Sequence, residues 1–238
     1  MVIATGSSAS SLTSTNKESA LISGTAYNVD GLAHAGMGLA VGDFDNDGNE
    51  DILVTNLTHE GCTLFHNDGK GNFDGVTAQY GLLQPTFHFT GFGTQWFDCD
   101  NDGLLDLFIA NGAVTIMESL RGNPYPFKQS NKLFHNEGVG MKFRETARIA
   151  GPAFGRGEVS RGAAFGDIDN DGDIDIVVAN NNGPVRLLLN ETNTRLRNHW
   201  LQVRLRAAKG DLFGIGARVE VQQPGQKLVR RFTPMEAT

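Results

Sequence analysis

The sequence predicts an all-β protein, a partial β-propeller of about three four-stranded blades followed by a short extra β module. One Asp-rich loop of nine residues occurs three times, and short apolar runs typical of strands lie on both sides of every copy. Glycine accounts for 30 of the 238 residues, well above average use. That abundance favours many tight turns over long helices.

The repeated loop spans residues 43–51, 98–106 and 167–175, with Asp at positions 1, 3, 5 and 9 and Gly at position 6. Carboxylates this close repel one another unless a cation lies between them or water surrounds them. Ca²⁺ takes six to eight oxygen ligands at about 2.3–2.6 Å from flexible loops, and Gly permits the left-handed turn that folds the loop around an ion. We expect side-chain oxygens from positions 1, 3, 5 and 9 and the backbone carbonyl from position 7. These expected metal ligands are Asp43, Asp45, Asp47, Asn49, Asp51, Asp98, Asp100, Asp102, Leu104, Asp106, Asp167, Asp169, Asp171, Asp173 and Asp175.

The loops differ from an EF-hand, which needs a Glu at position 12 and a helix on each side. Position 12 is Val54, Ile109 or Val178, so no carboxylate is available there. The runs that follow the loops, from position 9 onward, are rich in β-branched and aromatic residues, which predicts buried strands. The runs before them combine apolar residues with Gly and are also strand-like. Each loop is therefore expected to join two strands of one hairpin.

Three alternatives compete with a structural calcium site. A metal-free hairpin turn rich in Asp, Asn and Gly is one, but identical ligand spacing in three loops disfavours it. Mg²⁺ demands a tighter octahedron and keeps its waters, so it fits less well than Ca²⁺. A metal shared with a partner's carboxylate is disfavoured because four Asp and a carbonyl nearly fill the coordination sphere. We expect about three Ca²⁺ ions in structural roles.

Two further repeats follow each loop. The segment Leu-Phe-His-Asn occurs at 64–67 and 133–136, with Leu-Leu-Leu-Asn at 187–190 as a third copy. A later repeat at 71–78 and 141–147 supplies a fourth strand, which the third unit lacks. His66 and His135 recur at one repeat position and are expected to be structural. The aromatic residues at matching strand positions are expected to pack between blades: Phe65, Phe134, Trp96 and Phe165.

The sequence suggests three segments. Residues 1–18 are rich in Ser, Thr and Ala and are expected to be disordered, without the features of a signal peptide. Residues 19–194 are expected to form the blades, beginning at 19–27 with what resembles the last strand of a preceding blade. A polar insertion at 112–130 belongs on a loop face. In residues 195–238 apolar and polar side chains alternate, in a pattern different from the repeats. This pattern predicts two or three further strands, at 199–206, 210–222 and 227–232.

Charge and composition exclude several classes of protein. The formal net charge of −7 argues against a nucleic-acid backbone as partner, and three bound Ca²⁺ would bring it to about −1. No apolar run of 18 residues occurs, so no transmembrane segment is expected. Cys62 and Cys99 could form one disulfide, but Cys99 lies inside the second Asp-rich loop, which favours two free thiols.

The repeats resemble FG-GAP/VCBS repeats, the blades of integrin-α-type propellers. The segment Asn-His-Trp-Leu at 198–201, with Gly-Ile-Gly-Ala-Arg-Val at 214–219, resembles the start of an ASPIC/UnbV domain. Segments 26–38 and 159–167 also resemble family segments between blades. The order of these parts resembles the cartilage acidic protein 1-like family of secreted proteins. Its members are longer, and three blades are too few to close a ring, so the resemblance implies truncation at both ends.

The resemblance implies an extracellular or cell-surface protein with a role in adhesion or recognition and without catalytic residues. The leading hypothesis is therefore a calcium-stabilised, non-catalytic interaction module for an unknown protein or glycan ligand. Open blade edges are expected to receive missing blades or to self-associate. The alternative is a polysaccharide-active enzyme whose catalytic part is missing or unrecognised, since paired carboxylates can serve in acid–base chemistry. Against it, the clustered carboxylates are already assigned to the metal.

Overall fold

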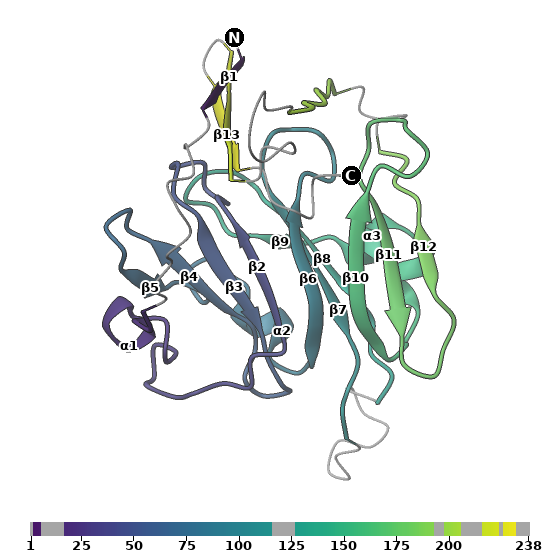
Figure 1. The fold of residues 1–238 in the computed structure, drawn as a ribbon. Coiled ribbons are helices and arrows are strands. Elements are labelled where there is room, and N and C mark those ends of the chain that lie inside the picture. Colours follow the sequence, from purple (N-terminus) through teal and green to yellow (C-terminus); the bar gives the residue numbers. More distant parts are fainter. Residues whose placement is uncertain are drawn as a thin grey trace.

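The computed structural model describes residues 2–5, 17–115, 127–192, 198–205, 216–223 and 226–231. Within these ranges the strands form four antiparallel sheets, and the helices have four residues each. Figure 1 shows three sheets side by side and a small sheet beyond one end of them. The predicted all-β fold, a partial propeller with a short extra β module, is confirmed.

Each of the three sheets that lie side by side is one blade, and its first two strands are joined by an Asp-rich loop. The register pairs the residue before each loop with position 9: Gly42 with Asp51, Phe97 with Asp106 and Gly166 with Asp175. As expected, the third blade has three strands in the described chain. The blade strands are β2 (Gly38–Gly42), β3 (Asp51–Thr55), β4 (Thr63–Asn67) and β5 (Phe73–Gly75); β6 (Gly91–Phe97), β7 (Asp106–Asn111), β8 (Lys132–His135) and β9 (Arg144–Glu145); and β10 (Ser160–Gly166), β11 (Asp175–Asn180) and β12 (Arg186–Leu188).

The middle blade packs against both neighbours. Its first strand, β6, contacts β2 on one side and β10 on the other (Figure 1). One apolar cluster joins the first and second blades and includes Trp96 and Phe134, and another joins the second and third, with Phe165 packed against it. The expected packing between blades is confirmed for these three aromatic residues. Phe65 is buried too but lies outside both clusters.

The first strands of neighbouring blades approach so closely that Gly is required. A Cβ at Gly38 would lie 2.0 Å from the Phe92 carbonyl oxygen and 2.7 Å from Oγ1 of Thr55. A Cβ at Gly93 would lie 2.5 Å from the backbone nitrogen of Ala163. Gly38 and Gly93, which precede the first two Asp-rich loops, are thus spacers between blades.

We expect Gly38→Ala to destabilise the chain by about 1–3 kcal/mol, because backbone must move to admit the methyl group. The measurement is the midpoint of urea unfolding. Gly155→Ala is the matched control, since a Cβ at Gly155 has nothing within 4 Å. Equal midpoints for the two variants would contradict the close approach.

Three expectations about the ends of the chain need correction. Val2–Thr5 forms β1, which pairs with β13 (Arg218–Gln223), so the expected disorder of residues 1–18 is wrong there. The β-branched run of β1 adds to the open edge of β13, whose other neighbour is β14 (Gln226–Arg231). The expected strand at 19–27 contains α1 (Ala20–Ser23) instead, because Gly24 at φ 87° closes a helical turn. Residues 199–205 form no strand.

Short helical turns connect the blades. They are α2 (Leu83–Thr86), α3 (Ala147–Ala150) and the 3₁₀ helix η2 (Pro152–Gly155). The expected insertion at 112–130 lies partly outside the described residues, which exclude 116–126; a bridge pairs Gln129 with Glu158. In the described part of the chain, no helix is long and apolar enough to cross a membrane.

Candidate metal centres

The three Asp-rich loops fold by the same local hydrogen bonds. The carboxylate at position 1 accepts from the backbone N–H groups of positions 5 and 6, at 2.9 Å and 2.9 Å for Asp43 and at 3.1 Å and 2.8 Å for Asp98. Asp167 repeats this with two bonds of 3.1 Å. The Gly at position 6 has φ of 95°, 90° and 93°, as the sequence predicted. Position 4 is also left-handed, which Asn tolerates well.

The carboxylate at position 9 ties each loop to the third strand of its blade. Asp51, Asp106 and Asp175 are fully buried. One oxygen accepts from the N–H of position 2, and the other accepts from the N–H of the Asn that ends the Leu-x-x-Asn repeat. The first set of bonds measures 3.3, 3.0 and 2.9 Å, and the second 2.9, 2.8 and 2.8 Å. Position 9 therefore connects segments that the sequence separates by about fifteen residues or more.

Carboxylates converge in every loop. The Asp residues at positions 1, 3 and 9 offer oxygens within 4.8 Å of one another in all three copies. In the first two loops, the Asp residues at positions 3 and 5 form a second such group with a histidine. The position 5 carboxylate also accepts from the N–H of position 7, at 2.7 Å for Asp47, 2.8 Å for Asp102 and 2.9 Å for Asp171. The predicted residues thus lie together for positions 1, 3 and 9, while Asp173 turns its carboxylate to Asn101, 2.7 Å away.

Burial makes these carboxylates hard to ionise without a cation. It raises the pKa of Asp51 from 3.8 to about 7, and nearby Asp45 adds to the effect. The pKa of Asp43 and of Asp98 rises to about 6 through burial and the neighbouring aspartates of each loop. Burial raises the pKa of Asp106 to about 6 as well. Burial disfavours the charged form of these carboxylates, and a nearby cation favours it. Carboxylate oxygens on a short loop are ligands that a hard divalent cation prefers.

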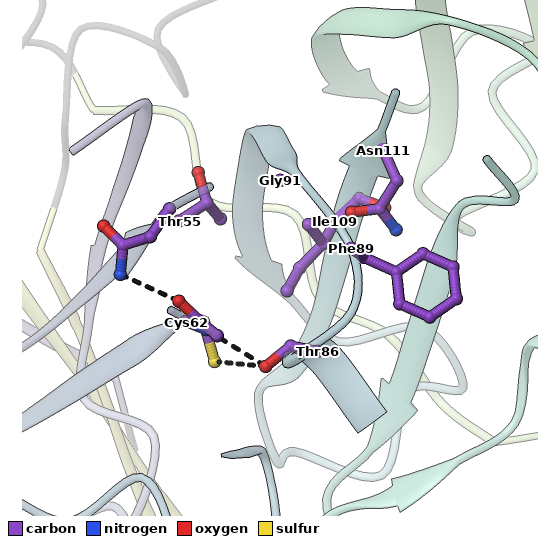
Figure 2. Close-up of a pocket in the computed structure, with 9 residues that line it drawn as sticks. Thr55, Cys62, Thr86, Phe89, Gly91, Ile109 and Asn111 are labelled. Atoms are coloured by element: carbon purple, nitrogen blue, oxygen red, sulfur yellow. Dashed lines mark hydrogen bonds between the residues drawn. The ribbon is translucent and has the colours of Figure 1, made fainter. Parts of the chain in front are cut away.

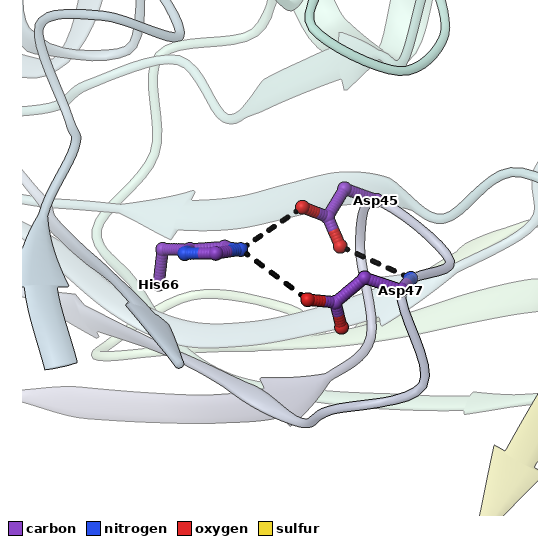
Figure 3. Close-up of side chains that lie close together, drawn as sticks. All are labelled: Asp45, Asp47 and His66. Atoms are coloured by element: carbon purple, nitrogen blue, oxygen red, sulfur yellow. Dashed lines mark hydrogen bonds and ion pairs between the residues drawn. The ribbon is translucent and has the colours of Figure 1, made fainter. Parts of the chain in front are cut away.

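Two histidines stand beside the carboxylates. Nε2 of His66 lies 3.1 Å from Asp45 Oδ2 and 3.6 Å from Asp47 Oδ2 (Figure 3). In the second blade, Nε2 of His135 lies 3.2 Å from Asp100 Oδ2. Their recurrence in the sequence predicted a structural role for these histidines and did not predict this contact. The sequence signal for this contact is that each histidine comes one residue before the Asn whose N–H donates to the Asp at position 9.

The Asn of the Leu-x-x-Asn repeat was also missed. Asn136 Nδ2 donates to the Phe44 carbonyl at 2.8 Å, in the loop of the preceding blade, and Asn190 Nδ2 donates to the Cys99 carbonyl at 2.8 Å. Asn46 and Asn101 at position 4 each donate to the position 6 carbonyl of the next loop, both at 3.4 Å. The three loops therefore form one row along the same end of the blades.

The C-terminal segment contacts this row. Arg230 donates to Asn46 Oδ1 and to the Gly103 carbonyl, both at 3.1 Å, and so bridges the first two loops. Asn198 donates to the Asp100 carbonyl at 2.7 Å. A Cβ at Gly172 would lie 2.0 Å from the indole nitrogen of Trp200, so the third loop is also contacted. The extra β module and the loops share an interface.

A small pocket lies between the first two blades, lined by residues that include Thr55, Cys62, Thr86 and Asn111 (Figure 2). Its polar groups bond to one another: the Cys62 N–H donates to Thr86 Oγ1 at 3.0 Å. Burial raises the pKa of the Cys62 thiol to about 11, which makes it a poor nucleophile near neutral pH. Cys62 and Cys99 are both free, as the sequence favoured.

The fold and these loops define a repeat protein made of propeller-type blades with Asp-rich hairpins. A family described as the FG-GAP-like repeat matches residues 43–109 and 98–178. The matches together span more than half of the chain, which therefore belongs to the FG-GAP-like repeat family. The comparison with curated proteins gave no match.

Proposed function

We propose that this chain is a calcium-stabilised, non-catalytic interaction module of a secreted or cell-surface protein, used in adhesion or recognition. The observation that carries the proposal is the convergence of positions 1, 3 and 9 in all three loops, with oxygens within 4.8 Å. All three converging residues are carboxylates, the ligands that Ca²⁺ prefers. The ligands proposed for each ion are those at positions 1, 3, 5, 7 and 9, the last of which is fully buried.

The proposed role of Ca²⁺ is structural. Bound Ca²⁺ would neutralise carboxylates whose burial opposes their ionisation. The chain's own contribution is to hold the oxygens in place: position 1 is oriented by two backbone N–H groups, and position 9 bridges the loop and the third strand. Since the loops also bond to one another, ordering one loop supports the next.

A catalytic role in the described residues has less support. The carboxylates that cluster are engaged with backbone N–H groups, and the buried Cys62 thiol resists ionisation. The alternative remains a polysaccharide-active enzyme with its catalytic part elsewhere or unrecognised. Release of oligosaccharides from a panel of polysaccharides would favour that alternative.

We place the blades at 19–194 and an ASPIC/UnbV-like module at 195–238, with Val2–Thr5 adding a strand to that module.

The partner is a protein or glycan, and the outer blades offer apolar side chains to missing blades or to another copy. Leu39 and Val41 of the first blade are 62% and 45% exposed. They occupy the repeat positions of Thr94 and Trp96, which the second blade buries between blades. Such exposed strand faces favour association.

The test of calcium binding is isothermal titration calorimetry with CaCl₂ on chelator-treated protein. We expect about three ions per chain. Absence of binding in the millimolar range would contradict the proposal, while one or two ions would show that some loops do not bind. Binding to arrays of glycans and matrix proteins, with and without calcium, then addresses the partner.

A further inference from the structure

The first two loops differ from the third by one side chain next to the carboxylates. His66 and His135 bring an imidazole nitrogen to positions 3 and 5, and the groups Asp45–Asp47–His66 and Asp100–Asp102–His135 offer ligand atoms within 4.8 Å of one another. The third blade has Leu189 at this repeat position. We propose that the first two loops are mixed nitrogen–oxygen sites that take a borderline divalent cation such as Zn²⁺, whereas the third loop does not.

The distances fit a metal held by these atoms. Zn²⁺ binds imidazole nitrogen and carboxylate oxygen at about 2.0–2.2 Å in a tetrahedron, so neighbouring ligand atoms lie about 3.3–3.6 Å apart. Nε2 of His66 lies 3.1 Å and 3.6 Å from the oxygens of Asp45 and Asp47. Figure 3 shows the imidazole nitrogen directed toward both carboxylates. Three protein ligands would leave a fourth position for water.

The chemistry of the donors distinguishes this site from a calcium site. Ca²⁺ prefers oxygen ligands alone, while imidazole suits Zn²⁺ and its neighbours in the first transition series. Both imidazoles are partly accessible, with side chains 28% and 20% exposed for His66 and His135, so an ion can enter without local unfolding.

The second blade has an additional feature of a metal-binding histidine. A histidine that binds a metal through one ring nitrogen usually offers the other to a carboxylate. Nδ1 of His135 lies 3.4 Å from Glu137 Oε1, an ion-pair distance at which Nδ1 makes no hydrogen bond, and Glu137 itself pairs with Arg144. Oδ1 of Asp100 is buried without a hydrogen-bond partner. Nε2 of the ring contacts the other oxygen of Asp100, Oδ2, so one carboxylate oxygen and the Nδ1 side of the ring stay available.

The third loop is a natural control within the chain. In each blade the residue after this repeat position is an Asn whose N–H donates to the Asp at position 9, and in the third blade Asn190 donates to Asp175 at 2.8 Å. The backbone therefore places Leu189 where the other blades have their histidines. Leu189 is 51% exposed, so a histidine side chain has room at this position. The inference rests on the proposed function, since Asp45, Asp47, Asp100 and Asp102 are also proposed calcium ligands. Zn²⁺ and Ca²⁺ therefore exclude one another in the first two loops.

The experiment titrates ZnCl₂ into the calcium-loaded chain and measures both metals in the protein after desalting. The variants are His66→Leu/His135→Leu, which makes both loops resemble the third, and Leu189→His, which does the reverse. We expect wild type to bind two more Zn²⁺ than the double variant and to release two Ca²⁺. We expect Leu189→His to bind one more Zn²⁺ than wild type. His59 and His88, whose rings lie 5.5 Å apart, are unchanged in every variant, so zinc bound there cancels.

Equal zinc content in wild type and the double variant, or no gain in Leu189→His, would overturn the inference and leave the calcium proposal intact. Failure of wild type to bind calcium would overturn the proposed function independently of the zinc result. Circular dichroism checks that each variant is folded. If the double variant does not fold, Leu189→His decides the question alone, by gaining a zinc ion or not.

Discussion

Removal of calcium at pH 7.5 is expected to lower the melting temperature of this chain by about 15–30 °C. At a free concentration of 100 Kd each ion adds about 2.7 kcal/mol to the folded state, so three ions add about 8 kcal/mol. For a chain of this size, each kcal/mol changes the melting temperature by about 2–4 °C. The measurement is thermal unfolding followed by circular dichroism, in CaCl₂ and after chelation. An unchanged melting curve would contradict the calcium proposal.

The same experiment should depend on pH in a defined direction. Burial raises the pKa of Asp51 from 3.8 to about 7 and that of Asp43 and Asp98 to about 6. Between pH 4 and 7 the metal-free folded chain therefore binds more protons than the unfolded chain. The stability that these protonated carboxylates support is fully present below about pH 4 and is lost as pH rises through 6 and 7. We expect metal-free protein to melt at a lower temperature at pH 8 than at pH 5.

Calcium should reverse this trend, because protons compete with the ion for the same oxygens. The gap in melting temperature between calcium-loaded and metal-free protein should widen from pH 5 to pH 8. Dialysed samples are preferable to a chelator for this series, since chelators lose affinity in acid. A gap that stays constant with pH would show that the buried carboxylates do not participate in binding.

The second large effect is expected from Asp106→Asn, at position 9 of the central loop. The carboxylate of Asp106 is fully buried and accepts from the N–H groups of Cys99 and Asn136. An amide has one acceptor oxygen, so one of these donors would face an NH₂ group, and the charge of a proposed calcium ligand would be lost. We expect a loss of about 3–5 kcal/mol in calcium, measured by urea unfolding.

Two comparisons make the Asp106→Asn result specific. Asp74→Asn, on the exposed side of β5, removes the same charge and should leave stability nearly unchanged. In chelated protein the loss for Asp106→Asn should shrink, because the metal no longer contributes and burial already opposes ionisation there. A loss of the same size with and without calcium would assign Asp106 to hydrogen bonding alone.

Because the loops contact one another, loss of one loop's structure should also weaken the contacts between blades. Asn136 follows the third strand of the second blade yet donates to the Phe44 carbonyl in the first loop. Arg230 of the extra β module bridges the first and second loops. Ordering of the loops by a cation would therefore stabilise contacts between blades and with the C-terminal module, as well as the hairpins themselves.

Much of the fold could be predicted because its signals are local. The apolar run after each loop formed β3, β7 and β11, with Asp51, Asp106 and Asp175 as their first residues. The end of the chain was harder, because β1 is separated by more than 200 residues from its partner β13. A run of four residues at 2–5 carries no sign of a partner so distant. The expected strand at 19–27 had only a weak strand pattern, and the helical turn that ends at Gly24 forms there instead.

The conformation of each loop could be predicted from its own residues, since the bonds made by positions 1 and 5 lie within nine residues. Asp at position 1 bonds to positions 5 and 6, and Asn and Gly accept the left-handed conformations, so spacing alone specifies the geometry. What surrounds the loops depends on contacts between strands and between blades. The pairing of β3 with β4 brings His66 to Asp45, and the packing of blade on blade brings Asn136 to Phe44. Such contacts depend on register and packing between strands far apart in the chain, which a local pattern does not encode.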